Sequence, residues 1–388
     1  MTKYIFKCGM LALFAGVLFT SCDPEIDSPG PTSGDADFSS YVSIGNSLTA
    51  GYSDAGLYLE GQLSSYPAIM AEQFKKVGGG EFVQPLFSEG QRNGFGYLRL
   101  AGITAQGPIL LPVTSELGIR AMVGPRSNVP LYTKFTGSVN NLGVPDMRVS
   151  EIKNENFGNP QNFDPATGRA LFFPAFERVT ATAQQSYLQY VQAQIAVAKP
   201  TFFSNWLGNN DVLNYATTGA FSGIISDVAT FEANYTELTN VLTATGAKGI
   251  VATIPSVTSI PFFTTVGPQL KASLTAAKVP AIVTLSGNTA ARVILPVSEI
   301  KSATGGTALI PLTASAYASL IGKPGGKYWR DIAKVAVPGN PTLGLAGLLA
   351  NYQIDTTKAF GVSAGNPWPS SILKTSRPAI RPNMVRAS

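Results

Sequence analysis

The stretch Tyr41-Val42-Ser43-Ile44-Gly45-Asn46-Ser47-Leu48-Thr49-Ala50-Gly51-Tyr52 lies in the first part of the chain. Its short apolar run ends at Gly45, which is typical of a buried strand. A serine just beyond the end of such a strand points its hydroxyl into the crevice above the sheet, and its own N–H can face a developing oxyanion. Alone, the segment is weak evidence for a nucleophile, because serine is also a common turn residue.

Strands and helices alternate along the rest of the chain. Apolar residues at helical spacing predict three helices, marked by Ile69, Met70, Phe74 and Val77, by Tyr187, Leu188, Val191 and Ile195, and by Phe231, Tyr235, Leu238 and Leu242. Short apolar runs at 201–207 and 249–254 predict two more buried strands. This alternation predicts an α/β fold with a parallel sheet and helices on both faces, whose ligands sit at the carboxyl ends of the strands.

Two stretches break this alternation. Residues 78–141 are rich in Gly and Pro, and residues 256–369 alternate short helical pieces with Pro/Gly turns. Long insertions of this kind form loops or caps around a site, or they only decorate the scaffold. The sequence leaves both interpretations open.

Two further segments carry polar side chains that suit a site at the sheet edge. Trp206-Leu207-Gly208-Asn209-Asn210-Asp211 ends the second predicted strand, so an Asn amide there can donate to the same oxyanion as the serine N–H. Asn140-Asn141-Leu142-Gly143-Val144-Pro145-Asp146-Met147-Arg148 lies between the two segments in sequence.

Together the three segments resemble those of the SGNH (GDSL-type) hydrolases, a family of esterases, lipases and acylhydrolases. The resemblance covers roughly residues 38–265. It implies a three-layer α/β/α sandwich with a parallel, flavodoxin-like sheet, in which Ser47 is the nucleophile and Asn210 the oxyanion-hole Asn. Asn46 stands where the family's first motif has Asp. Lipoproteins of Bacteroidetes that carry this domain look like the nearest relatives.

The second motif departs from the family pattern at its oxyanion-hole glycine. In the register that fits best, Asp146 occupies this position, and a carboxylate beside a forming oxyanion would oppose it. Loss of one oxyanion donor costs on the order of 10²–10³ in rate. In a register shifted within the motif, Gly143 is the functional glycine. Both Asp146 and Gly143 are therefore candidate site residues.

The chain contains no histidine. The family ends with Asp-x-x-His, in which the His takes the serine proton, and this motif is absent here. A serine hydroxyl is a poor nucleophile without a base, and loss of a triad member leaves ~10³–10⁴-fold catalysis over water. A lysine could replace the histidine only if burial depressed its pKa, and Lys327 and Lys358 are the two candidates considered.

Residues 1–21 have the pattern of a secretory signal, with Lys3 and Lys7 before the apolar run 10–19. Thr20-Ser21 before Cys22 resembles the lipobox of bacterial lipoproteins, which implies acylation of Cys22; a plain secretion signal with an incidental cysteine is the alternative. Residues 22–37 are rich in Pro, Ser, Gly and Asp, and we expect a flexible tether. The expected location is the cell envelope, as an outer-membrane lipoprotein that could face outward.

The net charge of +5 is concentrated at the two ends of the chain. Without the six basic residues near the termini, 22 basic residues face 23 acidic ones, which leaves −1. A nucleic-acid partner is therefore not expected. We expect no cofactor and no metal; the expected partners are a small-molecule, glycan or lipid ester and the membrane that holds the anchor.

The last residues, 374–388, differ in character from the domain expected over 38–373. They carry four basic residues, no acidic residue and no regular period. A solvated basic tail and a shifted reading frame that discards the Asp-x-x-His motif both explain this composition.

The sequence thus predicts a lipoprotein-anchored serine ester hydrolase with impaired catalysis. Its alternatives are a non-catalytic lipoprotein that binds a ligand or glycan on the same fold, and a truncated or frameshifted gene product.

Overall fold

The computed structural model describes residues 30–368, except 105–106, 126–127, 166–168, 218–224, 257–258, 286–288 and 337–339, and it also describes residues 373–374. Residues 1–35 and 36–388 form two compact units. The expected signal sequence, Cys22 and the first half of the expected tether, residues 22–29, lie outside the described residues, as does the basic tail beyond Lys374. Everything below concerns the second unit.

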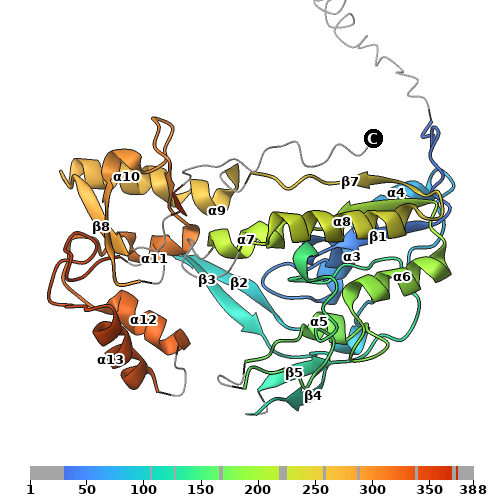
Figure 1. The fold of residues 1–388 in the computed structure, drawn as a ribbon, viewed down its shortest axis with the longest axis horizontal. Helices are drawn as coiled ribbons and strands as arrows, with labels where there is room; N and C mark the ends of the chain where they lie inside the picture. The colour runs from blue at the N-terminus through green and yellow to red at the C-terminus, as the bar shows by residue number, and fades with distance from the viewer. Residues whose placement is uncertain are drawn as a thin grey trace, which may run out of the picture. The chain divides into compact units, whose positions relative to one another are not determined.

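Three parallel strands form the sheet that positions the site (Figure 1). They are β1 (Tyr41–Gly45), β6 (Phe202–Trp206) and β7 (Lys248–Val251), in the order β1-β6-β7. Gly45 pairs with Trp206, so β1 and β6 end at the same level. The residues that follow these two strands therefore leave the sheet side by side.

An extended segment continues this sheet on the free side of β1. Asn141 forms a parallel bridge with Ser43. The N–H of Leu142 donates to Ser43 O at 2.8 Å, and the N–H of Val144 donates to Gly45 O at 3.0 Å. All three sequence motifs therefore reach the same edge of the sheet, although residues 140–144 lie outside the named strands.

Helices cover both faces of the sheet, as expected from the alternation of the sequence. Because side chains alternate along a strand, Tyr41 and Phe202 face α4 (Tyr66–Lys75), where they pack with Ala71 and Phe74. The opposite face is the main core, which the helices α6 (Tyr187–Ala198) and α8 (Val228–Thr243) cover. This core contains Val42, Ile44, Phe203, Leu188, Val191, Ile195, Leu238 and Leu242.

The elements between β1 and β6 are short. Helices α2 (Ser47–Ala50), α3 (Leu59–Leu63) and α5 (Pro174–Glu177) and the 3-10 turns η1 (Glu89–Gln91) and η2 (Val149–Glu151) alternate with two antiparallel hairpins. The hairpins are β2–β3 (Tyr97–Thr104, Gly107–Val113) and β4–β5 (Ile119–Val123, Val129–Tyr132). Helix α7 (Asn210–Thr217) follows β6.

The stretch after β7 has a hydrophobic core of its own. Its elements are α9 (Pro261–Thr264), α10 (Val266–Ala276), β8 (Ala281–Leu285), β9 (Arg292–Pro296), η4 (Val297–Glu299), β10 (Ala308–Leu309), η5 (Leu312–Ala314), α11 (Ser315–Ala318), α12 (Lys327–Ala336), α13 (Pro341–Asn351) and β11 (Leu373–Lys374). The side chains of Leu270, Ile282, Ile300 and Trp368 are buried together in this core. Residues 256–369 are thus more than loops around the site.

The strands and helices expected from the apolar patterns of β1, α4, α6, β6, α8 and β7 are present, and the parallel pairing is confirmed. The bounds differ in two places: β7 ends at Val251, before the predicted end at 254, and Val77 lies beyond the end of α4. In the part of the chain that the structure describes, no helix is both long enough and apolar enough to cross a membrane.

Candidate functional site

Ser47 is the first residue of α2 and follows β1 after one intervening residue. It is half-buried, and neither its N–H nor its hydroxyl forms a hydrogen bond with any described residue. The helix lies close to the strand because Gly45 has no side chain; an added Cβ would lie 1.9 Å from Thr49 Oγ1. Ser47 therefore presents a free donor and a free hydroxyl at the strand end.

Asn210 enters from the end of β6, at the start of α7. It is buried, and its Nδ2 donates one hydrogen to Met147 O at 3.2 Å. Because an amide nitrogen carries two hydrogens, the second remains available for another acceptor. This contact ties the third motif directly to the second.

Asp211 completes that link with its carboxylate, which is buried. Its Oδ2 accepts the N–H of Val149 at 2.8 Å, and its Oδ1 accepts the N–H of Ser150 at 3.0 Å. The Ser226 hydroxyl also donates to Oδ1 at 2.7 Å. These bonds cap the turn η2, so Asp211 has a structural role that the sequence analysis did not assign to it.

Gly143 packs directly against the backbone of α2. A Cβ added there would lie 2.4 Å from the N of Ala50 and 2.7 Å from the carbonyl carbon of Thr49. Its N–H donates to Asn141 Oδ1 at 3.0 Å. Gly143 therefore permits the close approach of the second motif to the helix that carries Ser47, while its own N–H is already engaged.

Asp146 has the left-handed conformation that glycine adopts most easily, with φ of 65°. Its N–H forms no hydrogen bond with any described residue. Burial raises the pKa of its carboxyl, and the positive charge of Arg148 opposes this shift only in part. The N–H of Asp146 is therefore free of bonds to the described residues, and the same residue carries an ionisable carboxyl.

Neither lysine that was considered as a base fits the role. Lys327 is exposed and forms an ion pair with Asp331, which raises the pKa of the ammonium group rather than lowering it. Lys358 is exposed as well. The suggestion of a buried lysine base at these two positions is therefore wrong, because neither side chain is desolvated.

Three polar atoms near the ends of β1 and β6 are buried and have no hydrogen-bond partner among the residues that the structure describes. They are Asn46 Nδ2, Trp206 Nε1 and Asn209 Oδ1. Buried polar groups are usually paired, so each such atom calls for a water or a ligand group. Sequence reasoning placed these residues inside the motifs but assigned them no role, and the amide side chains at positions 46 and 209 were the available signal.

A small cavity is lined in part by Gly143 and by Ala50 of α2. Its volume is about 10 Å³, close to the space that one water needs. Its polar wall includes Gln62, Asn141 and Arg178. A cavity of this size has no room for an ester substrate.

Arg178 is buried beside this cavity and is held by backbone carbonyls. Its guanidinium donates to Pro85 O, to Thr133 O at 2.9 Å and to Leu86 O at 2.8 Å, and it lies over the Phe87 ring. Burial lowers the pKa of Arg178 to about 10. The residue joins α5 to the loops that support the second motif.

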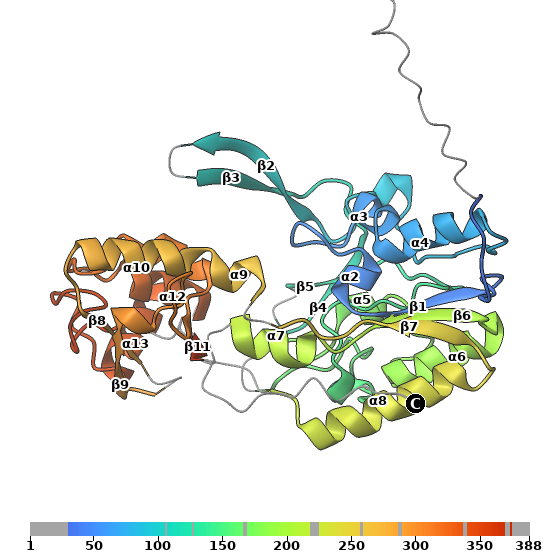
Figure 2. The same cartoon turned by 90° about the horizontal axis from the view of Figure 1, so that it is seen from above.

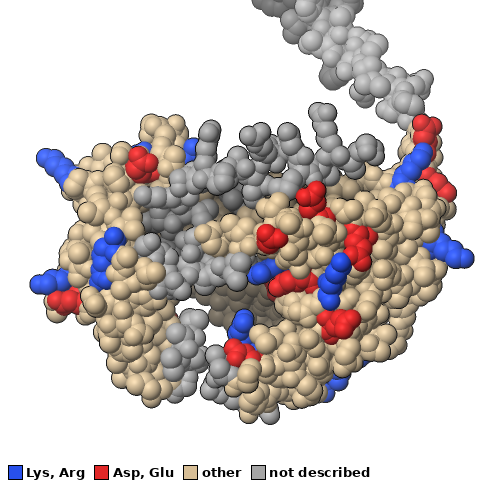
Figure 3. All heavy atoms as spheres, in the orientation of Figure 1, with Lys and Arg blue, Asp and Glu red and all other residues tan. Residues whose placement is uncertain are grey.

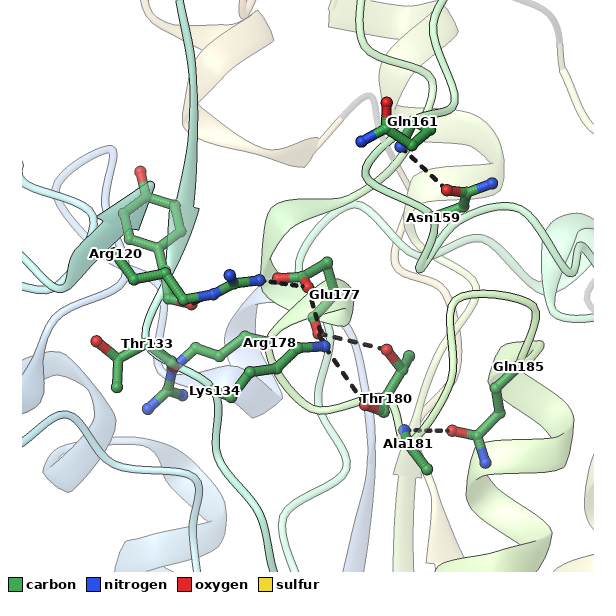
Figure 4. Close-up of polar contacts among 11 residues, drawn as sticks. Arg120, Thr133, Lys134, Asn159, Gln161, Glu177, Arg178, Thr180, Ala181 and Gln185 are labelled. Carbon is green, nitrogen blue, oxygen red and sulfur yellow. Dashed lines mark hydrogen bonds and ion pairs between the residues drawn. The ribbon is translucent and has the colours of Figure 1, made fainter. Parts of the chain in front are cut away.

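The neighbouring Glu177 holds two cations, and Figure 4 shows Arg120 and Lys134 meeting at its carboxylate. Both contact Oε1, at 2.8 Å and 2.9 Å, while Oε2 is buried without a partner. The Glu177 side chain is 3% exposed, whereas the two cations are each more than a third exposed. This cluster fastens β4–β5 to α5 and lies outside the three motifs.

The described residues contain no group of three or more Asp, Glu, Cys or His side chains that could hold a metal ion. Figure 3 shows a face on which basic and acidic side chains are interspersed among large uncharged areas.

Comparison with family models, with curated proteins and with solved structures finds no match for this chain.

Proposed function

We propose that this chain carries a serine ester-hydrolase domain of the SGNH type, and that its Ser47 site binds ester groups but turns them over slowly. The observation that carries the proposal is the register of β1 and β6. Because Gly45 pairs with Trp206, Ser47 and Asn210 leave neighbouring parallel strands at one edge of the sheet. The flavodoxin-like three-layer assignment is part of the same proposal.

The hydrogen bonds around Ser47 support an oxyanion site. The N–H groups of Ser47 and Asp146 are free of bonds to described residues, and Asn210 Nδ2 keeps one hydrogen available. Donors of this kind stabilise the negative charge that develops on the carbonyl oxygen during acyl transfer. In the proposed reaction, Ser47 Oγ bonds to the carbonyl carbon and gives its proton to solvent, while the bond to the alcohol oxygen breaks and the leaving alcohol takes a proton from solvent. Water then hydrolyses the acyl-serine to the free acid and restores Ser47.

The missing base limits this reaction. No histidine exists in the chain to accept the Ser47 proton. If Asp146 is the oxyanion-hole residue of the second motif, its carboxylate would also oppose the forming oxyanion. Oxyanion donors and substrate binding alone leave ~10³–10⁴-fold catalysis over water. These same facts favour the second candidate function, a lipoprotein that binds an ester or glycan ligand at this edge without converting it.

The proposal also includes anchoring. We infer that Cys22 is acylated and that the tether of residues 22–37 holds the body at the outer membrane. Replacing Cys22 by Ala should then move the protein from the membrane fraction to the soluble fraction. An unmodified N-terminus elsewhere, found by mass spectrometry, would contradict the anchor.

Hydrolysis of p-nitrophenyl acetate tests the catalytic part. We expect the protein to exceed the background rate only slightly, with the excess lost in Ser47→Ala and kept in Ser64→Ala, a matched change at an exposed serine. Extending the assay to longer acyl chains identifies the preferred ester. An excess that survives Ser47→Ala would sink the proposal, and robust turnover would show that an unrecognised base is present.

A further inference from the structure

The hairpin β2–β3 exposes apolar side chains to an unusual extent. The exposed fractions are 57% for Leu100, 79% for Ile103 and 50% for Leu110, and Leu98, Ile109 and Leu111 are exposed as well. Figure 2 shows the two strands extending beyond the helices near β1. Contiguous exposed apolar patches on a protein mark sites of interaction with a partner or a membrane.

Both faces of this ribbon carry exposed apolar side chains. One of them also carries Arg99, which pairs with Leu111. Leu100 pairs with Leu110, and side chains of directly paired residues point to the same face. Leu98 and Ile103 share that face by the pairing register. Ile109 and Leu111 alternate with Leu110 and therefore point to the opposite face. A protein partner that covered one face would leave the other in water.

The few charges of the hairpin and the chemistry of its edge also bear on which partner covers it. Arg99 is the one charged residue in the sequence from 97 to 113. Pro112 removes an N–H from β3, which disfavours pairing with a strand of another chain. At the base, Tyr97 stacks on Tyr58 with ring centroids 4.1 Å apart. Tyr is enriched where a protein crosses from water into lipid.

From these observations we propose that the β2–β3 hairpin inserts its apolar side chains into a lipid bilayer surface. The insertion is shallow, about 5–10 Å, as for interfacial helices. A two-stranded ribbon has two open edges whose N–H and C=O groups need water, so the hydrocarbon centre is excluded. This inference rests neither on the Ser47 chemistry nor on the anchor at Cys22.

Environment-sensitive fluorescence tests the proposal directly. Residues 36–388 form their own compact unit and contain no cysteine, so a single introduced cysteine can carry an NBD label. We expect the emission of labelled Leu100→Cys and Leu110→Cys to shift to the blue on adding phosphatidylcholine vesicles. Val197→Cys on α6, which replaces a side chain that is 64% exposed, is the matched control and should not respond.

A second measurement uses co-sedimentation of the unlabelled protein with the same vesicles. Replacing both Leu100 and Leu110 by Ser should weaken vesicle binding at least roughly tenfold, because each substitution removes one apolar side chain that would be buried in the bilayer. The matched pair Ile69→Ser and Val197→Ser, and the Ser47→Ala variant, should bind like the unchanged protein. Absence of a vesicle-dependent shift would overturn the proposal. So would a blue shift that grows with protein concentration in the absence of lipid, because it would assign the hairpin to a second copy of the chain.

Discussion

The carboxylate of Asp211 accepts the backbone N–H of Val149 at 2.8 Å, across 62 positions of sequence. This bond joins the segment after β6 to the turn η2, which follows the second motif. It therefore helps to hold Asn210, the neighbour of Asp211, beside Met147.

Asp211→Asn should therefore destabilise the protein. Both carboxylate oxygens of Asp211 accept a backbone N–H, whereas an Asn amide has only one oxygen that can accept. The N–H of Val149 or of Ser150 would therefore lose its acceptor. We expect a loss of about 1.5–3 kcal/mol in the free energy of unfolding, measured by urea denaturation. Glu232→Gln, at an exposed position on α8, is the control and should leave the stability unchanged. Equal stability of the two variants would show that the Asp211 bonds do not hold the site together.

Gly143→Ala should disturb the helix that carries Ser47. The new Cβ would meet the backbone of Thr49 and Ala50 at less than 3 Å, and backbone atoms cannot move aside as a flexible side chain can. We expect a destabilisation of about 1–3 kcal/mol, together with slower labelling of Ser47 by a serine-directed probe. Gly137→Ala is the matched control, because its Cβ would have no neighbour closer than 3.5 Å. Unchanged labelling in Gly143→Ala would contradict the close packing.

Asp146→Asn should stabilise the protein at neutral pH. Since the pKa of the Asp146 carboxyl is raised in the folded state, folding favours the protonated form, and this group costs stability as the pH rises above its ordinary value. Asn keeps the left-handed backbone conformation accessible. Asp146 is exposed, so water screens the effect to less than about 1 kcal/mol.

Thermal unfolding at about pH 4 and about pH 7 measures this difference, because an ordinary aspartate titrates near the lower value. The gain of Asp146→Asn should be larger at the higher pH. A gain that is larger at the lower pH would reverse the sign of the argument and show that Asp146 is stabilised in its charged form.

Glu177→Gln should cost more stability than the loss of a surface ion pair. Glu177 is buried and holds two cations, whereas Glu60 and its partner Arg92 are both exposed. We expect about 1–3 kcal/mol for Glu177→Gln and about 0–1 kcal/mol for the control Glu60→Gln. Chemical denaturation of both variants makes the comparison, and equal losses would remove the structural role of this cluster.

Much of the sheet could be predicted from the sequence, because its signals are local. The apolar run before Gly45 and the helical spacing of Leu188, Val191 and Ile195 specify their elements without help from distant residues. The left-handed conformation of Asp146 could not be predicted, because the sequence showed a departure from a family motif but not the backbone conformation at that position. The bond between Gly143 N–H and Asn141 Oδ1 depends on side-chain geometry that a motif does not encode.

The separate core around Ile282 and Trp368 escaped prediction for a different reason. Its elements are short and its contacts are distant in sequence, as in the bridge between Thr284 and Trp368. No periodic pattern in this stretch is long enough to predict such pairings. The strands of the hairpin β2–β3 were likewise not predicted, and their sequence was noted only as rich in Gly and Pro. A ribbon with apolar side chains on both faces lacks the apolar–polar alternation of a half-buried strand.

Covalent labelling of Ser47 by a fluorophosphonate, with the modified peptide identified by mass spectrometry, tests the central claim most directly. The account predicts a slow adduct on Ser47 that is absent in Ser47→Ala and slower still in Asn210→Ala, because both the nucleophile and its oxyanion donors are present while the base is missing. An adduct that forms elsewhere, or no adduct on Ser47 after prolonged exposure, would contradict the claim that this serine is a mounted nucleophile.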